Sequence, residues 1–255
     1  MTKHIDRLLP PGYINNPPVI KVLMPNRSPS PVNLPEVSTR RTRRKDARPG
    51  ELLASALDLF VERGYAATRV DDIAQHAGVS KGTLFLYFPS KEDLFKAVVR
   101  ENISVRFAEW EDEVNCFQGP TSDLLHQCLF GWWERIGSTQ ASGISKLMMS
   151  EAKNFPELAD FYQREVIQPG NALIERILVR GVARGEFRTL DVPSCIFLVL
   201  APMLFLAMWK HSLGTCCGSP VGMDPLRYLR AQLDMLLHGF AAPTPQSTAL
   251  EPRPT

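Results

Sequence analysis

A single short segment, TRVDDIAQHAGVSKGTLFLYFPSK, constrains the fold of this chain more than any other part of it. Ala74 is small enough to let two helices approach closely, Gly78 permits a tight turn with positive φ, and Leu84 is placed to fill the space between the helices. Two short helices joined in this way form a helix-turn-helix, whose second helix stands at the surface and can enter a DNA major groove. We expect this segment, Thr68 to Lys91, to carry the function of the chain.

Helices are predicted before and after the segment. In the first of them, apolar residues recur at i, i+3, i+4 and i+7, Pro49 suits the first turn and Gly64 suits the C-cap. Thr68 is expected to begin the next helix, because an acidic residue follows it three positions later. The last helix of this group starts at Ser90 and continues to about Trp110.

The rest of the chain is also predicted to be helical, and no strand-like alternation persists in it. Prolines stand near the predicted helix starts and glycines near the predicted ends. The expected fold class is therefore all-α, with the helix-turn-helix in the N-terminal part and further helices in the C-terminal part. The predicted C-terminal helices lie at 122–137, 144–152, 156–184 with an interruption around Pro169–Gly170, 191–213 and 224–240.

Composition and charge agree with this organisation. The chain is 44% apolar and 22% charged, which fits a soluble globular protein and excludes a fully disordered chain or a small disulfide scaffold. Residues 1–100 carry 16 basic and 10 acidic side chains, whereas residues 101–255 carry 13 and 17. A polyanion is therefore expected to meet the N-terminal part.

The chain is expected to divide into two domains and two tails. Residues 1–39 contain eight prolines and are predicted to be a disordered tail, as are residues 241–255. Residues 40–100 are expected to contain the helix-turn-helix, and residues 101–240 are expected to form a second, helical domain. The first domain opens with a basic arm that is expected to contact DNA phosphates through Arg44 and Lys45, the alternative being a solvated linker. Translation starts at either Met1 or Met24.

The first turn of the second helix in the helix-turn-helix has residues that suit a DNA phosphate. Ser80, Lys81, Gly82 and Thr83 are small or cationic and include three side-chain hydrogen-bond donors. The free N–H groups and the partial positive charge of a helix N-terminus favour a phosphate as well. Gly82 lowers the helix propensity by roughly 1 kcal/mol relative to alanine, a cost that close approach to another surface explains.

Three further side chains near the end of this helix are candidate DNA contacts. Phe85 is placed to meet a thymine methyl group or a sugar, while Tyr87 and Lys91 are placed to contact phosphates. The alternatives are that Phe85 and Tyr87 pack on neighbouring helices and that Lys91 is a solvated lysine. Lys81, Thr83 and Phe85 are the residues expected to discriminate between base sequences.

The pattern AATRVDDIAQHAGVSKGTLFLYFPSKEDLFKAVV resembles the N-terminal domain of the TetR/AcrR family of transcriptional regulators, over roughly residues 49–100. The resemblance implies an N-terminal three-helix helix-turn-helix DNA-binding domain over residues 40–100, a linking fourth helix, a divergent C-terminal helical domain for effector binding and dimerisation over residues 101–240, and a homodimer. It also implies that helices 191–213 and 224–240 form a four-helix bundle with their counterparts in a second copy. Phe85 stands where tyrosine is common and Leu86 where polar residues are common, which changes the expected base readout. The family's usual DNA-facing positions fall on Thr68, Arg69, Ser80, Lys81, Gly82, Thr83, Phe85, Tyr87 and Lys91.

A helix with no polar face is predicted in the C-terminal part. Residues 195–209 read CIFLVLAPMLFLAMW, a run that is about five residues too short to span a membrane and that contains Pro202. We interpret it as a buried helix that a leucine stripe starting at Leu226 helps to cover in an isologous dimer. Aromatic and methionine side chains of this domain are candidates for the wall of a cavity for a small apolar or aromatic effector, the alternative being ordinary core. These candidates are Trp132, Trp133, Met148, Met149, Phe161, Phe197 and Met203.

The function that these observations favour is sequence-specific DNA binding by a transcriptional regulator. We expect a cytoplasmic, ligand-responsive, homodimeric repressor that binds double-stranded DNA at a near-palindromic operator and has no membrane partner. The sequence contains no Gly-rich phosphate loop, nucleophile elbow or metal-ligand cluster, so we expect no enzyme activity, no metal site and no cofactor. Two alternatives stay open: a helical partner-binding module that does not bind DNA, and a thiol-based redox-responsive regulator acting through Cys216 and Cys217.

Overall fold

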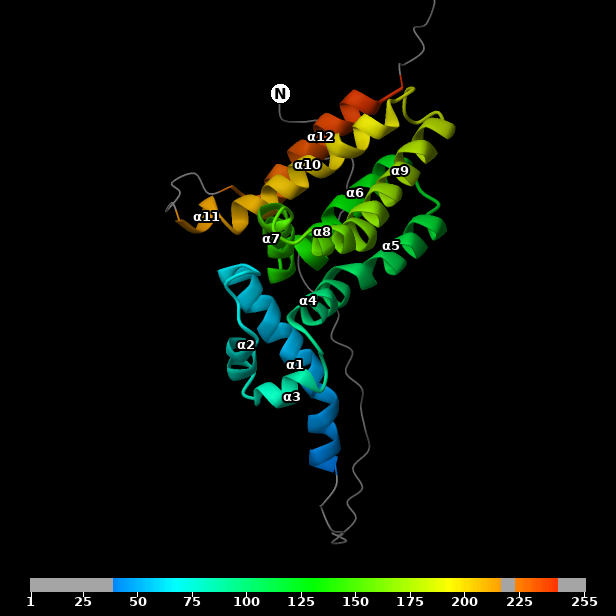
Figure 1. Cartoon of the computed structure of the whole chain (residues 1–255). Helices are drawn as coiled ribbons and strands as arrows, with labels where there is room; N and C mark the ends of the chain where they lie inside the picture. The colour runs from blue at the N-terminus through cyan, green and yellow to red at the C-terminus, as the bar shows by residue number, and fades with distance from the viewer. Residues whose placement is uncertain (1–38, 217–222, 243–255) are drawn as a thin grey trace, which may run out of the picture. The chain divides into compact units, whose positions relative to one another are not determined.

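The computed structural model describes residues 39–216 and 223–242, which form helices joined by short turns (Figure 1). These residues include no β-strand, only an isolated bridge between Phe187 and Ala241, so the predicted all-α fold class is confirmed. The α-helices are α1 (Thr39–Arg63), α2 (Val70–His76), α3 (Lys81–Phe85), α4 (Lys91–Val99), α5 (Val105–Cys116), α6 (Thr121–Trp132), α7 (Gly143–Glu151), α8 (Pro156–Tyr162), α9 (Gln168–Ala183), α10 (Val192–Lys210), α11 (Leu213–Cys216) and α12 (Pro225–Phe240). The π-helical turns are η1 (Arg100–Ser104), η2 (Trp133–Gly137) and η4 (Gln163–Ile167), and η3 (Gln140–Ser142) is a 3-10 turn.

Helix α1 begins earlier than the sequence predicted. It starts at Thr39 instead of near Pro49, because the arginine-rich residues before the proline are good helix formers and the helix continues through it. The apolar face predicted for this helix is buried, with Ala56 and Phe60 fully enclosed. Gly64 follows the helix with a φ of 84°, a left-handed conformation that suits glycine.

The turn between α2 and α3 has the geometry that its sequence predicted. Gly78 has a φ of 66°, and Ala74 of α2 and Leu84 of α3 are buried at 2% and 0% exposure. The two helices therefore pack closely around the leucine, as in a helix-turn-helix. Helix α2 itself begins at Val70, two residues after the predicted start at Thr68, whose side chain does not cap the helix.

An unbroken helical run, α4–η1–α5, links the head, which we define as helices α1 to α3, to the remaining helices, which we call the rear. The run starts after the N-cap Ser90 and ends at Cys116, beyond the predicted end near Trp110. The domain boundary predicted between residues 100 and 101 falls inside this run and stays a prediction. The described residues from Thr42 onward belong to one compact unit, so the head and the rear are packed together.

The rear helices follow the predicted layout with one main difference. The predicted interruption around Pro169 is wrong: the proline lies in the first turn of α9, and the helix continues into it from η4. Gln168, the residue before the proline, donates its N–H to the Gln163 carbonyl oxygen five residues back, as in a π-helical turn. The tails predicted at 1–39 and 241–255 lie outside the described residues except at their inner ends.

Two clusters of buried side chains form the core. The first joins the head and α4 to α7 and α8, and includes the edge-to-face pair Phe60 and Phe95. The second is built from α6, α9, α10 and α12, with Ile177 at 0% exposure. Cys128 and Trp132 of α6 pack against both clusters, so this helix joins the two parts of the core.

Helix α10 is long and apolar enough, by length and composition, to cross a membrane. One face, which includes Cys195, Val199 and Met203, is buried in the second cluster, as expected for a core helix. The opposite face is exposed and carries Phe197 and Leu198. A single chain therefore leaves one face of this apolar helix uncovered.

Candidate DNA-contacting surface and effector cavity

The N-terminal end of α3 is exposed, as the sequence predicted. The Ser80 hydroxyl oxygen accepts a hydrogen bond from the N–H of Thr83 at 3.1 Å and lies 2.9 Å from the Thr83 hydroxyl. Lys81 and Gly82 are exposed and Thr83 is half-buried. A Cβ added to Gly82 would meet only the Ser80 hydroxyl, at 3.8 Å, so no neighbour within the described chain requires a glycine there. The approach of a second surface at Gly82 stays a prediction.

Lys81 is the cation that the structure places most clearly at this surface. Its Nζ lies 3.0 Å from Asp71 Oδ2 of α2, and both side chains are exposed. The same Nζ lies 6.0 Å from the centroid of the Phe85 ring. Lys81 therefore lies near both an acidic partner and the candidate base-contacting ring. Arg44 and Lys45 belong to the N-terminal part of α1, and their contact with DNA stays a prediction.

Two large apolar side chains are exposed at the end of α3. Phe85 is 39% exposed and Leu86 is 83% exposed, and adjacent exposed apolar side chains are typical of a binding surface. Among the described residues, Tyr87 and Phe88 pack against the first core cluster, whereas Phe85 and Leu86 belong to neither cluster. Of the two residues for which packing on neighbouring helices was the alternative to DNA contact, Tyr87 therefore shows such packing and Phe85 does not. Leu86 was expected from the sequence to change the base readout but was not included among the DNA-contacting residues, and its exposure makes it a candidate contact.

The structure corrects the prediction for Thr68. Its side chain is only 1% exposed, and its hydroxyl lies within hydrogen-bond distance of the Leu59 carbonyl oxygen at 3.1 Å and the Gly64 carbonyl oxygen at 2.7 Å. A hydroxyl enclosed in this way closes the end of α1, and the Thr68 side chain does not face solvent. The next residue, Arg69, is exposed at the N-cap of α2 and stays a candidate phosphate contact.

The structure also gives Lys91 a different role from the predicted phosphate contact. Its Nζ donates hydrogen bonds to the carbonyl oxygens of Tyr65 at 2.9 Å and Thr68 at 3.1 Å, with the Ala66 carbonyl oxygen at 3.5 Å. Burial lowers the pKa of Lys91 below its usual value. The ammonium group therefore fastens α4 to the loop after α1, and its donors are used inside the protein.

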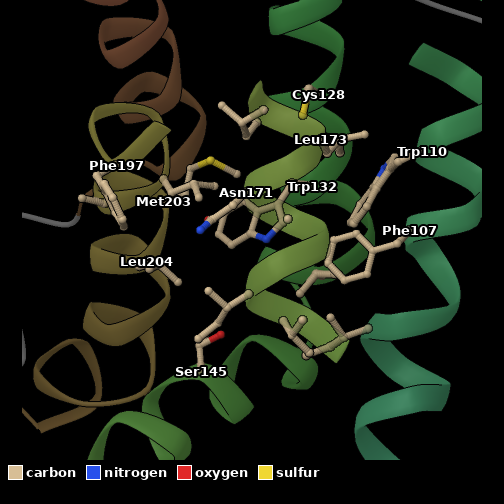
Figure 2. Close-up of a pocket in the computed structure, with 18 of the residues that line it drawn as sticks. Phe107, Trp110, Cys128, Trp132, Ser145, Asn171, Leu173, Phe197, Met203 and Leu204 are labelled. Carbon is tan, nitrogen blue, oxygen red and sulfur yellow. The ribbon is translucent and has the colours of Figure 1, made fainter. Parts of the chain in front are cut away.

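A cavity of about 350 Å³ lies in the rear, between α5, α6, α7, α9 and α10 (Figure 2). Figure 2 shows Phe107 and Trp110 on one side and Phe197 and Leu204 on the other, with Trp132 between them. The volume is more than twice the ~150 Å³ of an engineered cavity that holds benzene, and it falls in the range of small-molecule sites. The cavity is therefore large enough for a molecule of at least two rings or an equivalent chain.

Some of the predicted effector-binding residues line this cavity and others do not. Those in its wall are Trp132, Met149, Phe197 and Met203. Trp133, Met148 and Phe161 lie outside the wall, and Met148 and Phe161 are buried in the first core cluster instead. The sequence reasoning missed other wall residues because a helical period identifies an inner face but not the positions that border empty space. These include Ile103, Phe107, Trp110, Cys128, Ile136, Ser145, Tyr162, Asn171 and Leu204.

The polar groups of the cavity wall are few and uncharged. The hydroxyls of Ser145 and Tyr162 are 3.0 Å apart, and Asn171 contributes an amide. Burial raises the pKa of Tyr162 and raises the pKa of Cys128 to about 12, so both side chains stay protonated at neutral pH. The described residues of the wall include no Asp, Glu, Lys, Arg or His. Such a wall suits a molecule whose enclosed part is neutral.

Three π-helical turns border the cavity. Ile103 belongs to η1, Ile136 to η2, and Val166 and Ile167 to η4, and all four side chains are part of the wall. A π-helical turn contains an additional residue and is frequent at functional sites. The additional residue in each turn shifts the side chains that follow out of the regular helical register.

Helix α7 connects the cavity wall to the head. Ser145 and Met149 line the cavity, while Gly143 at the start of the helix lies so close to α1 that an added Cβ would come within 2.5 Å of a Val61 methyl group. At the other end, Glu151 accepts a hydrogen bond at 3.3 Å from a main-chain N–H of the loop after α1. A shift of α7 on the cavity side therefore reaches the head directly.

Comparison with known proteins identifies the same two regions. Residues 52–98 match the family model for bacterial regulatory proteins of the tetR family, and residues 119–213 match the tetracyclin repressor-like C-terminal domain. The HTH-type transcriptional repressor KstR2 of Mycobacterium tuberculosis is 39% identical over 183 residues, which cover 71% of this chain and 90% of that repressor.

Solved structures share the fold at lower identity. The fatty acid degradation regulator FadR of Bacillus halodurans has a TM-score of 0.61 and 21% identity, covering 74% of this chain and 94% of that one. FadR of Bacillus subtilis, solved in complex with stearoyl-CoA, has a TM-score of 0.55 and 19% identity, covering 75% and 98%. At these identities the likeness concerns the fold alone.

Proposed function

This chain belongs to the TetR family of bacterial regulatory proteins, and we propose that it represses transcription as a dimer that releases its operator when an apolar effector binds. Its helix-turn-helix makes it a DNA-binding transcriptional regulator. The observation that carries the proposal is that an exposed helix α3 and a neutral cavity occur in one compact unit, joined through α7 and α4. A change in the shape of the cavity can therefore alter the position of the head.

The proposed DNA contacts lie on the exposed side of the head. Lys81, Thr83, Phe85 and Leu86 belong to α3 or follow it directly, and they are assigned to the base edges. Arg69 and the basic arm are assigned to phosphates, which give affinity that falls with salt. In a dimer, two α3 helices about 34–36 Å apart read successive major grooves, so the operator is near-palindromic.

The proposed dimer uses α10 and α12. Phe197, Leu198 and Phe205 of α10 and Met235 of α12 are large apolar side chains exposed to solvent. The rings of Phe205 and Tyr228 are 6.4 Å apart, so the exposed faces of the two helices adjoin. One continuous apolar face of this kind suits an isologous contact with a second copy.

The proposed effector has a neutral, apolar part that enters the cavity. The wall is uncharged, and Ser145, Tyr162 and Asn171 offer hydrogen bonds to one or two polar atoms of the effector. The Bacillus subtilis FadR structure holds stearoyl-CoA, whose acyl chain is apolar and whose coenzyme is charged. A molecule of that type would place its chain or ring system in this cavity and keep its charged group outside. Its effect on DNA binding is limited to its differential affinity for the two conformations.

Selection from a random pool of DNA duplexes tests the DNA-binding part of the proposal. We expect the bound fraction to become enriched in a near-palindrome whose half-sites are one helical turn apart. We also expect neutral apolar compounds to release the protein from the selected duplex. Retention of no duplex at low salt would contradict the proposal and favour the partner-binding module. An enriched sequence without two-fold symmetry would contradict the dimer.

The regulator is proposed to act in the cytoplasm, where DNA is accessible, and without a membrane partner. The thiol-based alternative has no support from the structure, because Cys217 lies outside the described residues and Cys216 is the last residue described before that gap. Burial raises the pKa of the Cys128 thiol to about 12, so this thiol stays protonated at neutral pH.

A further inference from the structure

The effector cavity is open on one side. Four of its large apolar wall residues are exposed themselves: Met149 of α7 by 61%, Ile167 of η4 by 39%, Phe197 of α10 by 63% and Leu204 of α10 by 37%. Ala201, which lies between the last two on α10, is also exposed. An apolar molecule in the cavity would keep part of its surface in water at this mouth, and the favourable burial of that part would be lost. The site is therefore incomplete in a single chain.

The mouth continues into the exposed apolar face of α10. Phe197 and Leu204 are seven residues apart and share one stripe of the helix, and Figure 2 shows both on the same side of the cavity. Leu198 and Phe205 form the adjacent stripe, which leads to α12. Lys210 at the end of the helix is its only charged residue. The wall of the cavity and the proposed dimer face therefore share the side chains of one helix.

We propose that the second copy of this chain closes the mouth of the cavity with its own α10, so that the effector site is complete only in the dimer. This inference rests on the proposed function, in which the cavity holds the effector. The uncharged face of α10 suits a like surface, because a second copy brings the same apolar side chains to the mouth. A membrane is a poorer occupant, since the Cys195, Val199 and Met203 side of α10 is buried in the core and is not available to lipid.

Closure by the second copy links dimerisation to effector binding. The effector binds more tightly to the dimer, and by reciprocity it strengthens the dimer by the same factor. The affinity for an apolar molecule therefore depends on the concentration of the protein. A cavity that is complete within one chain would show no such dependence.

The experiment uses the full chain and N-phenyl-1-naphthylamine, a neutral apolar probe whose fluorescence rises in apolar surroundings. The double variant Leu198→Glu/Met235→Glu places charges on the exposed face of α10 and α12 and leaves the cavity wall intact, because neither residue lines it. Sedimentation equilibrium gives the oligomeric state, and fluorescence titration gives the affinity for the probe. We expect the variant to be monomeric and to bind the probe at least tenfold more weakly.

Two comparisons make this result specific. The control Val105→Glu/Val179→Glu also places two glutamates on exposed apolar positions, on α5 and α9, and should keep both the dimer and the probe affinity. When the unmodified protein is diluted to concentrations at which its dimer dissociates, its affinity for the probe should fall by the same factor. That dilution series needs no variant, so a folding defect of the glutamate variant cannot hide the outcome.

A monomer that binds the probe as tightly as the dimer would overturn the inference, as would a dimer that persists with both glutamates. Binding of the unmodified protein to phosphatidylglycerol vesicles would assign the α10 face to a membrane and would also overturn it. If the cavity does not hold the effector at all, the proposed function itself fails, and the results differ from those above. In that case the dimer binds no probe, or Ser145→Phe in the cavity wall leaves the affinity for the probe unchanged.

Discussion

The ammonium group of Lys91 is held by Tyr65: its Nζ lies 2.9 Å from the Tyr65 carbonyl oxygen and 4.3 Å from the centroid of the Tyr65 ring. The Thr68 carbonyl oxygen accepts a second hydrogen bond at 3.1 Å. Tyr65 in turn packs against Phe60 and Phe95, with ring centroids 5.6 Å and 5.4 Å away. The first residue of α4 is therefore fastened to the aromatic centre of the head.

We predict that Lys91→Met destabilises the protein by roughly 1–3 kcal/mol, because partly buried carbonyl groups lose their hydrogen-bond donor. Urea unfolding measures the change in the free energy of unfolding. Lys153→Met is the matched control, since it removes the same charge from an exposed position and should change stability by less than about 0.5 kcal/mol.

The same variant separates this role from a phosphate contact. A lysine on a phosphate contributes about 0.9 to the slope of log K against log salt for duplex DNA. We expect Lys91→Met to leave that slope unchanged under conditions in which the variant is folded. Unchanged stability together with a slope reduced by about one would show that Lys91 binds DNA.

The helix-turn-helix could be predicted from the sequence because its constraints are local. The small Ala74 was expected between two close helices, Gly78 in a turn with positive φ, and Leu84 in the space between the helices. The structure confirms all three expectations. Thr68 and Lys91 could not be placed in the same way. A hydroxyl or an ammonium group at a loop can face solvent or turn back to carbonyl oxygens, and only the fold decides which acceptors are near.

The wall of the cavity could be predicted only in part, for a geometrical reason. Trp132 and Trp133 are adjacent, and a helical period cannot say which of two bulky neighbours borders empty space. The π-helical turn that begins at Trp133 also shifts the register of the side chains that follow it. Ser145 and Asn171 were missed because a polar residue in a mainly apolar wall has no signal in an apolar pattern.

We predict that Asp71→Asn strengthens DNA binding about two- to fivefold at low salt, and by a similar factor for all duplexes. Asp71 forms an exposed ion pair with Lys81, so its removal frees the lysine and takes a negative charge away from the DNA-facing surface. Fluorescence anisotropy with specific and random duplexes measures the effect. Asp160→Asn, at an exposed position on α8, is the control and should leave the affinity unchanged. An affinity that falls would mean that Asp71 positions the lysine for its contact.

We predict that Gly143→Ala destabilises the protein by about 1–3 kcal/mol and weakens the connection between α7 and the head. The added Cβ would lie 2.5 Å from one Val61 methyl group and 2.9 Å from the other, so the two helices must move apart. Thermal unfolding gives the stability, and the operator affinity with and without effector gives the coupling.

Two further variants test whether this contact is the cause. Gly239→Ala in α12 adds a Cβ with nothing within 4 Å, so it should be neutral or stabilise by up to about 1 kcal/mol. The double variant Gly143→Ala/Val61→Ala removes the methyl groups that clash and should recover part of the loss. Additive losses in the double variant would show that the close approach of α7 to α1 is not what Gly143 provides.

His211, which follows α10, is held in its neutral form. Its Nε2 lies 2.8 Å from the Ser142 hydroxyl, and its carbonyl oxygen accepts a hydrogen bond from Lys146 Nζ at 2.6 Å. Burial, and then the charges of Lys210 and Lys146, lower the pKa of His211 from 6.5 to about 4. Between about pH 6.5 and pH 4, His211 is therefore neutral in the folded protein and protonated in the unfolded chain.

We predict that the stability of the protein falls as the pH is lowered from about 6.5 to 4, in the window between the unfolded and folded pKa values of His211. Above this window the imidazole is neutral in both states, and below it both states are protonated, so the loss is then complete. We expect roughly 1–2 kcal/mol from this residue, because its ring is only partly buried. Urea unfolding of the unmodified protein and of His211→Gln at pH 7.5 and pH 4.5 isolates the contribution, since carboxylates titrate alike in both. Equal losses in the two proteins would show that His211 is not the group responsible.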